Sequence, residues 1–240
     1  MEKVQFENGQ FILYSPDSLK YITDNMYEIL ISKFDFYKKI FDIDSFRKVQ
    51  INYFDDIETF RNFIYDLRGE KDSLPKYAKG TFDNGMINAY IEPNWLIGSP
   101  MYYKKLYMAS HELFHIMYQE IVWKNNNQPR VVWFDEGMAQ FFSGEFDKDL
   151  NEDNFDKWFN NIVSNTKEIP NLNELSHDNN FETDNYSGYI LSLLAVKYLY
   201  EKLSFDEFKE LMKNTDDIIK YGENVLPEAI KYYQGKQKTL

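Results

Sequence analysis

The stretch that most constrains this chain is residues 108–119, MASHELFHIMYQ, which contains an H-E-x-x-H pattern. On a helix, residues four positions apart lie on one face, with Cβ atoms about 5–6 Å apart. His111 and His115 have this spacing, so their imidazoles can bind one metal ion from the same side of a helix. Glu112 lies one position further round, where it can act on a water molecule at that ion. The pattern therefore predicts a helix with a metal-binding face.

A pattern with three fixed positions also arises by accident in helices, so the metal prediction depends on a third ligand. The chain has three histidines, and two of them fall in this pattern. Downstream, the segment Trp133–Ala139 (WFDEGMA) supplies a carboxylate at Glu136. Two imidazoles and one carboxylate are a common ligand set of catalytic zinc sites. We therefore expect His111, His115 and Glu136 to hold one zinc ion.

Composition excludes several other classes of protein. Of the 240 residues, 43% are hydrophobic and 18% are aromatic, which is enough apolar material for a core and argues against disorder. The formal net charge of -12 would repel phosphate groups, so we expect no nucleic-acid partner. The absence of cysteine excludes disulfides and cysteine-ligated metal sites.

The ends of the chain and its apolar runs bear on location. The N-terminal sequence MEKVQFENGQF lacks a basic region followed by an apolar run, as a signal peptide would have. No stretch approaches the roughly 20 apolar residues of a membrane span. We therefore expect no membrane partner and a cytoplasmic location for the chain as written, or secretion if a leader has been removed.

The order of local patterns predicts an α+β fold. Strand patterns occur at 4–14, 48–54 and 78–93, before or just ahead of the H-E-x-x-H stretch, whereas the patterns after it are mostly helical. We expect an N-terminal lobe, residues 1–125, with a small mixed sheet and the zinc-binding helix. A mostly helical C-terminal lobe, residues 126–240, would carry the third ligand. The two lobes would form one catalytic unit, with the active-site cleft between them.

Turn and capping signals mark where several elements begin. Asn84-Gly85 between two β-prone runs predicts a hairpin. Ser99-Pro100 predicts the start of one helix that carries the H-E-x-x-H residues to about Lys124. Capping boxes are predicted at Asp55 with Glu58 and at Ser204 with Glu207, and a long apolar helix is predicted over 186–203.

These residues resemble the gluzincins, the thermolysin-like superfamily of zinc metallopeptidases. His111-Glu112-Leu113-Phe114-His115 followed by Glu136 matches the ligand pattern, and WFDEGMA resembles the W-x-x-E-G-x-A segment that carries the third ligand. The run 189–199 is similar to a later helix of that superfamily, which begins with a functional tyrosine. The resemblance covers about residues 78–203 and is closest to the compact members called peptidase-MA-like.

The resemblance implies a peptidase that hydrolyses peptide bonds of a peptide or protein substrate with a zinc-activated water. Glu112 would be the general base, and His111, His115 and Glu136 would hold the one zinc ion as cofactor. A tyrosine hydroxyl would stabilise the oxyanion of the substrate. Tyr189 is the tyrosine in the matching position, and Tyr186 is its rival.

In gluzincins the strand before the zinc-binding helix pairs with extended substrate at the edge of the sheet. Residues 85–91 (GMINAYI) have that place in this sequence, so Asn88 and Ala89 would bind substrate through their backbone groups. The zinc aminopeptidases of the superfamily carry a G-x-M-E-N segment, in which the glutamate binds the substrate amine. Ile87 stands in the glutamate position in this sequence. The resemblance therefore implies an endopeptidase.

Other roles stay open from the sequence. Asp135 and Glu145 are candidates for the carboxylates that orient ligand imidazoles, although neither has a matching spacing. His177 is expected to be a surface or loop histidine, with a transition-state donor of the kind thermolysin uses as the alternative. Two other functions are a catalytically weak or inactive peptidase-fold binding module and a purely structural zinc site. No fourth protein ligand is evident, and this argues against a structural site.

Overall fold

The computed structural model describes residues 3–71, 74, 78–92, 98–124, 127–177 and 180–237. It has the predicted α+β class, with a small mixed sheet in the N-terminal part and many helices. The chain divides into two compact units, residues 1–116 and 117–240, which are described in turn. Among the described residues, no helix is both long enough and apolar enough to span a membrane.

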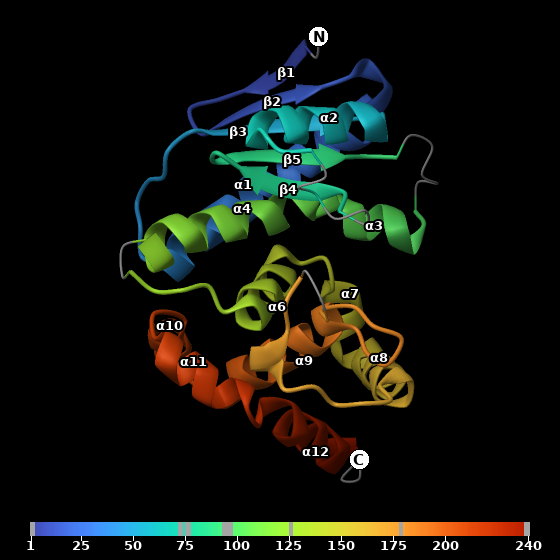
Figure 1. Ribbon diagram of the computed structural model, residues 1–240, viewed down its shortest axis with the longest axis vertical. Coiled ribbons are helices and arrows are strands. Elements are labelled where there is room, and N and C mark those ends of the chain that lie inside the picture. Colours follow the sequence, from blue (N-terminus) through green and yellow to red (C-terminus); the bar gives the residue numbers. More distant parts are fainter. Residues whose placement is uncertain are drawn as a thin grey trace. The chain divides into compact units, whose positions relative to one another are not determined.

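The first unit contains a mixed five-stranded sheet with the order β1-β2-β3-β5-β4 (Figure 1). Its outer pairs, β1 with β2 and β4 with β5, are antiparallel, whereas β3 runs parallel to both of its neighbours. β5 thus lies inside the sheet and β4 lies at one edge. The strands are β1 (Lys3–Glu7), β2 (Phe11–Ser15), β3 (Val49–Phe54), β4 (Gly80–Asp83) and β5 (Met86–Tyr90).

The turn between β4 and β5 confirms the predicted hairpin. Asn84 and Gly85 both have positive φ angles, 49° and 72°. A two-residue hairpin turn with two positive φ angles matches the right-handed twist of the strands, and asparagine followed by glycine adopts it at low cost. This tight turn places β4 directly beside β5.

The described residues of the first unit include the starts of four α-helices: α1 (Lys20–Phe41), α2 (Ile57–Arg68), α3 (Pro100–Leu106) and α4 (Met108–Tyr118). Ser99 caps α3 as predicted, because its Oγ accepts a hydrogen bond from the Tyr102 N–H at 3.2 Å. The cap of α2 was predicted one residue too early. Asp56 caps it instead, accepting from the Thr59 N–H at 2.8 Å.

The single helix predicted from Ser99 to about Lys124 is divided in the structure. The Tyr107 N–H bonds to the Lys104 carbonyl at 3.2 Å, a tight i to i+3 turn that ends α3. α4 begins at Met108, and a π-helical turn over Gln119–Trp123 follows it. π-helical turns are rare and are often found near functional sites.

The two faces of the sheet carry different helices. Phe54 of β3 packs against Phe60 and Ile64 of α2 on one face. Side chains alternate along a strand, so Val49 of β3, five residues before Phe54, points to the other face with its partner Phe11 on β2. α1 packs there through Phe34, whose ring meets Phe11 of β2 edge-on at 5.4 Å between centroids. α4 packs on α1 through Phe114, whose ring lies 5.3 Å from that of Tyr37.

The second unit is helical. After the π-helical turn it comprises α6 (Val132–Ser143), α7 (Asp147–Leu150), α8 (Glu152–Asn165), a short 3₁₀ turn (Leu172–Glu174), α9 (Gly188–Lys202), α10 (Phe205–Met212), α11 (Thr215–Gly222) and α12 (Val225–Gln237). Buried side chains of α8, α9 and α12 form one core cluster, Phe159, Leu194, Ala229 and Tyr233. The capping box at Ser204 and Glu207 is confirmed at the start of α10.

α6 and α9 approach each other closely at a glycine. A Cβ atom on Gly137 of α6 would lie 2.5 Å from the backbone oxygen of Ser192 on α9. The two helices can therefore pack at this distance only without a side chain at position 137. α9 begins at Gly188, with Ser187 as its N-cap, so the helix starts two residues later than predicted. Tyr186 precedes the helix.

Candidate metal centre

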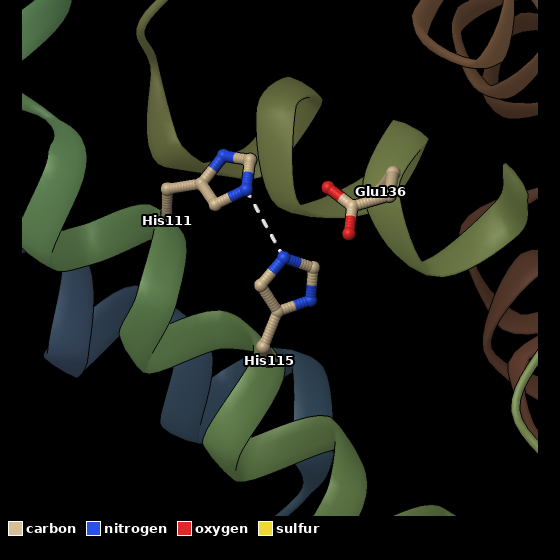
Figure 2. Close-up of side chains that lie close together, drawn as sticks. All are labelled: His111, His115 and Glu136. Atoms are coloured by element: carbon tan, nitrogen blue, oxygen red, sulfur yellow. Dashed lines mark hydrogen bonds between the residues drawn. The ribbon is translucent and has the colours of Figure 1, made fainter. Parts of the chain in front are cut away.

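Among the described residues, His111, His115 and Glu136 form a group that could hold a metal ion. Each residue offers one ligand atom, and these atoms lie within 4.8 Å of one another. Figure 2 shows the two imidazoles, which belong to α4, and the carboxylate, which belongs to α6. These are the three ligands predicted from the sequence.

The helical spacing of the two histidines brings their rings together. Nε2 of His115 lies 3.0 Å from Nε2 of His111, the contact that is dashed in Figure 2. Zinc binds imidazole nitrogen at about 2.0–2.1 Å, so two donors of one ion lie at most about 4.2 Å apart. The histidine pair meets this condition. Two imidazoles and a carboxylate also match the donor types of a catalytic zinc ion, so the residue types present fit that metal.

The edge strand β4 contacts the ligand face of α4 at two points. The ring of Phe82 stacks on the imidazole of His115, with 5.7 Å between centroids and 27° between planes. Two residues earlier on the same strand, a Cβ on Gly80 would lie 2.9 Å from Oε1 of Glu112. Residues two apart on a strand point to the same face, so Gly80 and Phe82 both face α4. β4 thus lies beside both the candidate base and one candidate ligand.

The expectation that the strand before the motif is an edge strand is wrong. β5 pairs with β3 on one side and with β4 on the other, so both rows of its backbone hydrogen-bonding groups face neighbouring strands. Asn88 and Ala89 are fully buried. The Asn88 side chain accepts a hydrogen bond at 2.7 Å from Nδ2 of Asn52, its neighbour on β3. This position does not support substrate pairing at Asn88 and Ala89, because β4 covers the edge that a substrate would need.

Glu136 has a charged partner that the sequence did not indicate. Nη2 of Arg130 donates to Oε1 of Glu136 at 2.6 Å, and Nε of the same guanidinium donates to Oδ2 of Asp135 at 2.7 Å. Burial disfavours the charged form of Arg130, but the two carboxylates outweigh this effect and raise the pKa of Arg130 above its ordinary value. The candidate ligand is therefore one member of a three-residue charge cluster. Asp135, proposed as a partner for a ligand imidazole, pairs with this arginine.

His177 was predicted to be a surface or loop histidine, and this is only half right. It lies in a turn, but its side chain is 24% exposed and its Nε2 lies 3.0 Å from Oε1 of Glu136. The Tyr189 hydroxyl lies 3.4 Å from Nδ1 of His177. Tyr189 on α9 is therefore two contacts away from the candidate ligand. For Tyr186, the rival tyrosine, burial and then Glu168 and Glu174 raise the pKa.

Two residues near Glu136 were not singled out from the sequence: Arg130 and Gln140. Gln140 lies one helical turn after Glu136 and is buried, and its Oε1 has no hydrogen-bond partner among the described residues. The position of Gln140, one helical turn after Glu136, could have identified it as a neighbour of the candidate ligand. No local pattern pointed to Arg130. Glu145, the second predicted carboxylate, lies just beyond α6, where its N–H bonds to Ser143 Oγ at 3.4 Å.

Comparison with known proteins adds no family to this description. No protein-family model matches the chain, and no curated protein matches it.

Proposed function

We propose that this protein is a zinc-dependent peptidase of the gluzincin type that cleaves within peptide or protein chains. The observation that carries the proposal is the group formed by His111, His115 and Glu136, whose ligand atoms lie within 4.8 Å of one another, with Glu112 in the same pattern. The resemblance of WFDEGMA to the gluzincin third-ligand segment supports the same class.

Each side chain has a defined task in this proposal. His111, His115 and Glu136 would hold the ion. Zinc, when bound, supplies Lewis acidity to the substrate carbonyl and lowers the pKa of a water molecule toward about 7. Glu112 accepts a proton from the attacking water on its carboxylate and passes it to the leaving amine. The Tyr189 hydroxyl donates a hydrogen bond to the substrate oxyanion.

The sheet supports cleavage within a chain. Ile87, in the position of the amine-binding glutamate of aminopeptidases, is fully buried on β5. A buried isoleucine offers no charge to a substrate amine. An extended substrate would instead add to the edge strand β4, whose Gly80 and Phe82 lie against Glu112 and His115.

The test is Glu112→Gln, assayed for zinc content and for cleavage of a peptide library. Glutamine keeps the size of the side chain but cannot accept the proton, so we expect zinc to stay bound while hydrolysis falls about 10²–10⁴-fold. Glu210→Gln is the matched control, because the Glu210 side chain is 76% exposed and its ion pair is with Lys213, three residues further along the chain.

Two results would overturn parts of the proposal. Unchanged turnover in Glu112→Gln would remove Glu112 from the mechanism. If the wild-type protein holds stoichiometric zinc but cleaves no peptide in the library, the peptidase proposal is wrong. That result would favour a zinc-containing binding module.

A further inference from the structure

Arg130 joins two neighbouring carboxylates at the start of α6. Its Nε lies 2.7 Å from Oδ2 of Asp135, and its Nη2 lies 2.6 Å from Oε1 of Glu136. Both distances are those of charge-assisted hydrogen bonds, which are shorter and stronger than neutral ones. The contacts come from two different nitrogens of one planar group, so the guanidinium fixes the direction of both carboxylates at once.

The burial of these carboxylates makes the arginine necessary. The side chains of Asp135 and Glu136 are 0% and 7% exposed. Two adjacent buried anions repel each other and lose hydration, which disfavours both charges unless each is paired. Arg130 lies within hydrogen-bonding distance of both. Asp135 in turn balances the charge of the arginine, so the pair adds little net positive charge beside the candidate metal ligand.

The guanidinium is itself held in place. Its Cζ lies 5.7 Å from the centroid of the Trp123 ring, in the π-helical turn that follows α4. Stacking of arginine on an aromatic face restricts the plane of the guanidinium. Oε1 of Glu136 faces this fixed donor and lies 3.0 Å from Nε2 of His177. Two contacts on Oε1 therefore fix the orientation of the Glu136 carboxylate.

We propose that Arg130 is a positioning residue for the third metal ligand: by holding Oε1 of Glu136 it fixes the orientation in which the carboxylate meets the ion. The inference rests on the metal site of the proposed function but does not depend on peptidase activity. The Arg130 contacts fix Glu136 before metal binds, and this lowers the cost of ordering the carboxylate when the ion arrives. Partners that orient ligands in this way are typically worth about 10–100-fold in metal affinity.

The experiment measures zinc affinity by competition with a chromogenic chelator in wild-type protein, Arg130→Met and Arg130→Lys. Methionine keeps part of the apolar stem but removes the donors, so we expect about 10–100-fold weaker zinc binding. Lysine keeps the positive charge but lacks the planar guanidinium, so it can hold one carboxylate but not both. We therefore expect a smaller loss of zinc affinity than in Arg130→Met. Lys197→Met is the matched control, because Lys197 is also a partly buried cation that pairs with a carboxylate, and that carboxylate, Glu201, is not one of the three ligands.

A second readout separates positioning from loss of fold. Cobalt(II) bound in place of zinc absorbs visible light with an intensity that reports ligand number and geometry. We expect the spectrum of Arg130→Lys to differ from wild type while its thermal unfolding without metal stays close to that of Lys197→Met. If Arg130→Met fails to fold, Arg130→Lys carries the test.

The outcomes distinguish this inference from the proposed function. Equal zinc affinity and an unchanged cobalt spectrum in both Arg130 variants would overturn the positioning role while leaving the peptidase proposal intact. Tighter zinc binding in Arg130→Met would overturn it as well, because the arginine would then compete with the metal for Glu136. A wild-type protein that binds no zinc would remove the proposed function and this inference together.

Discussion

Gly80 and Glu112 are in contact across β4 and α4, and only a glycine fits at this point without moving the carboxylate. A Cβ atom at position 80 would lie 2.9 Å from Oε1 of Glu112, whereas its next neighbours, Sδ and Cγ of Met108, would lie at ordinary contact distances of 3.5 and 3.6 Å. The backbone of Gly80 does not need a positive φ angle. The glycine at residue 80 therefore leaves room for the carboxylate of Glu112.

We expect Gly80→Ala to fold and to lose activity. The clashing atom is the end of a flexible side chain, so Glu112 can turn away at little cost in stability. A catalytic group displaced by about 1 Å can cost about 10²-fold in rate, so we expect kcat for a cleavable peptide to fall by at least about 10-fold. Zinc affinity should not change. Gly235→Ala is the control, because nothing lies within 4 Å of a Cβ there. Equal kcat in the two variants would contradict this expectation.

The variants Tyr189→Phe and Tyr186→Phe test which of the two hydroxyls stabilises the oxyanion. The Tyr189 hydroxyl lies 3.4 Å from Nδ1 of His177, whose Nε2 lies 3.0 Å from Glu136. Tyr186 precedes α9 and is not part of this chain of contacts. Loss of an oxyanion donor costs about 10²–10³-fold in kcat, so we expect a loss of this order in Tyr189→Phe and little change in Tyr186→Phe. The reverse pattern in steady-state kinetics would exchange the roles of the two tyrosines.

Gly137→Ala tests the packing that supports Glu136. A Cβ at residue 137 would lie 2.5 Å from the Ser192 oxygen and 2.7 Å from Cγ2 of Val196, and the backbone oxygen cannot move without moving α9. Overpacking of this kind typically costs about 1–3 kcal/mol in the free energy of unfolding. We expect urea denaturation to show a loss in this range. The same substitution at Gly235 on α12 should stabilise by up to about 1 kcal/mol, because alanine favours helices. Equal midpoints for both variants would refute the close packing of α6 on α9.

Glu201 supplies a prediction about pH. Burial raises its pKa, but hydrogen bonds and charges from Lys197 and then Lys236 outweigh burial, so the folded-state pKa lies below the ordinary value. A lowered folded pKa stabilises the protein above the unfolded pKa of about 4.3, and this stability is lost as pH falls through the folded value.

We therefore expect Glu201→Gln to be less stable than wild type at pH 7. The pair is partly exposed and screened by solvent, so the difference should be about 0.5–1 kcal/mol. It should shrink toward zero below about pH 4 as the wild-type carboxylate becomes protonated. Urea denaturation at several pH values measures this. A difference that is the same at pH 3 and pH 7 would show that packing, and not the charge of Glu201, is the cause.

Features that depend on neighbours in the sequence were predicted well. The Asn84-Gly85 turn, the Ser99 cap and the capping box at Ser204 all form as expected, because each depends on backbone angles and hydrogen bonds within a few residues. The α+β class follows from the order of such local elements. The errors of one or two residues at the starts of α2 and α9 are also local, because a neighbouring residue of similar capping ability can take the cap.

No sequence pattern predicted the contacts between segments that are far apart in the chain. Whether β4 or β5 forms the edge depends on the pairing of β3 with β5, between residues about 36 positions apart, and hairpin patterns look the same in either order. The contact of Gly80 with Glu112, the guanidinium of Arg130 on Glu136 and the approach of His177 to the same carboxylate arise from packing of separate elements. The residue types and spacing of the H-E-x-x-H stretch are enough to name candidate ligands, because a helix has a regular repeat. The groups that orient those ligands emerge only from the fold, because side chains far apart in sequence meet at positions that no periodicity encodes.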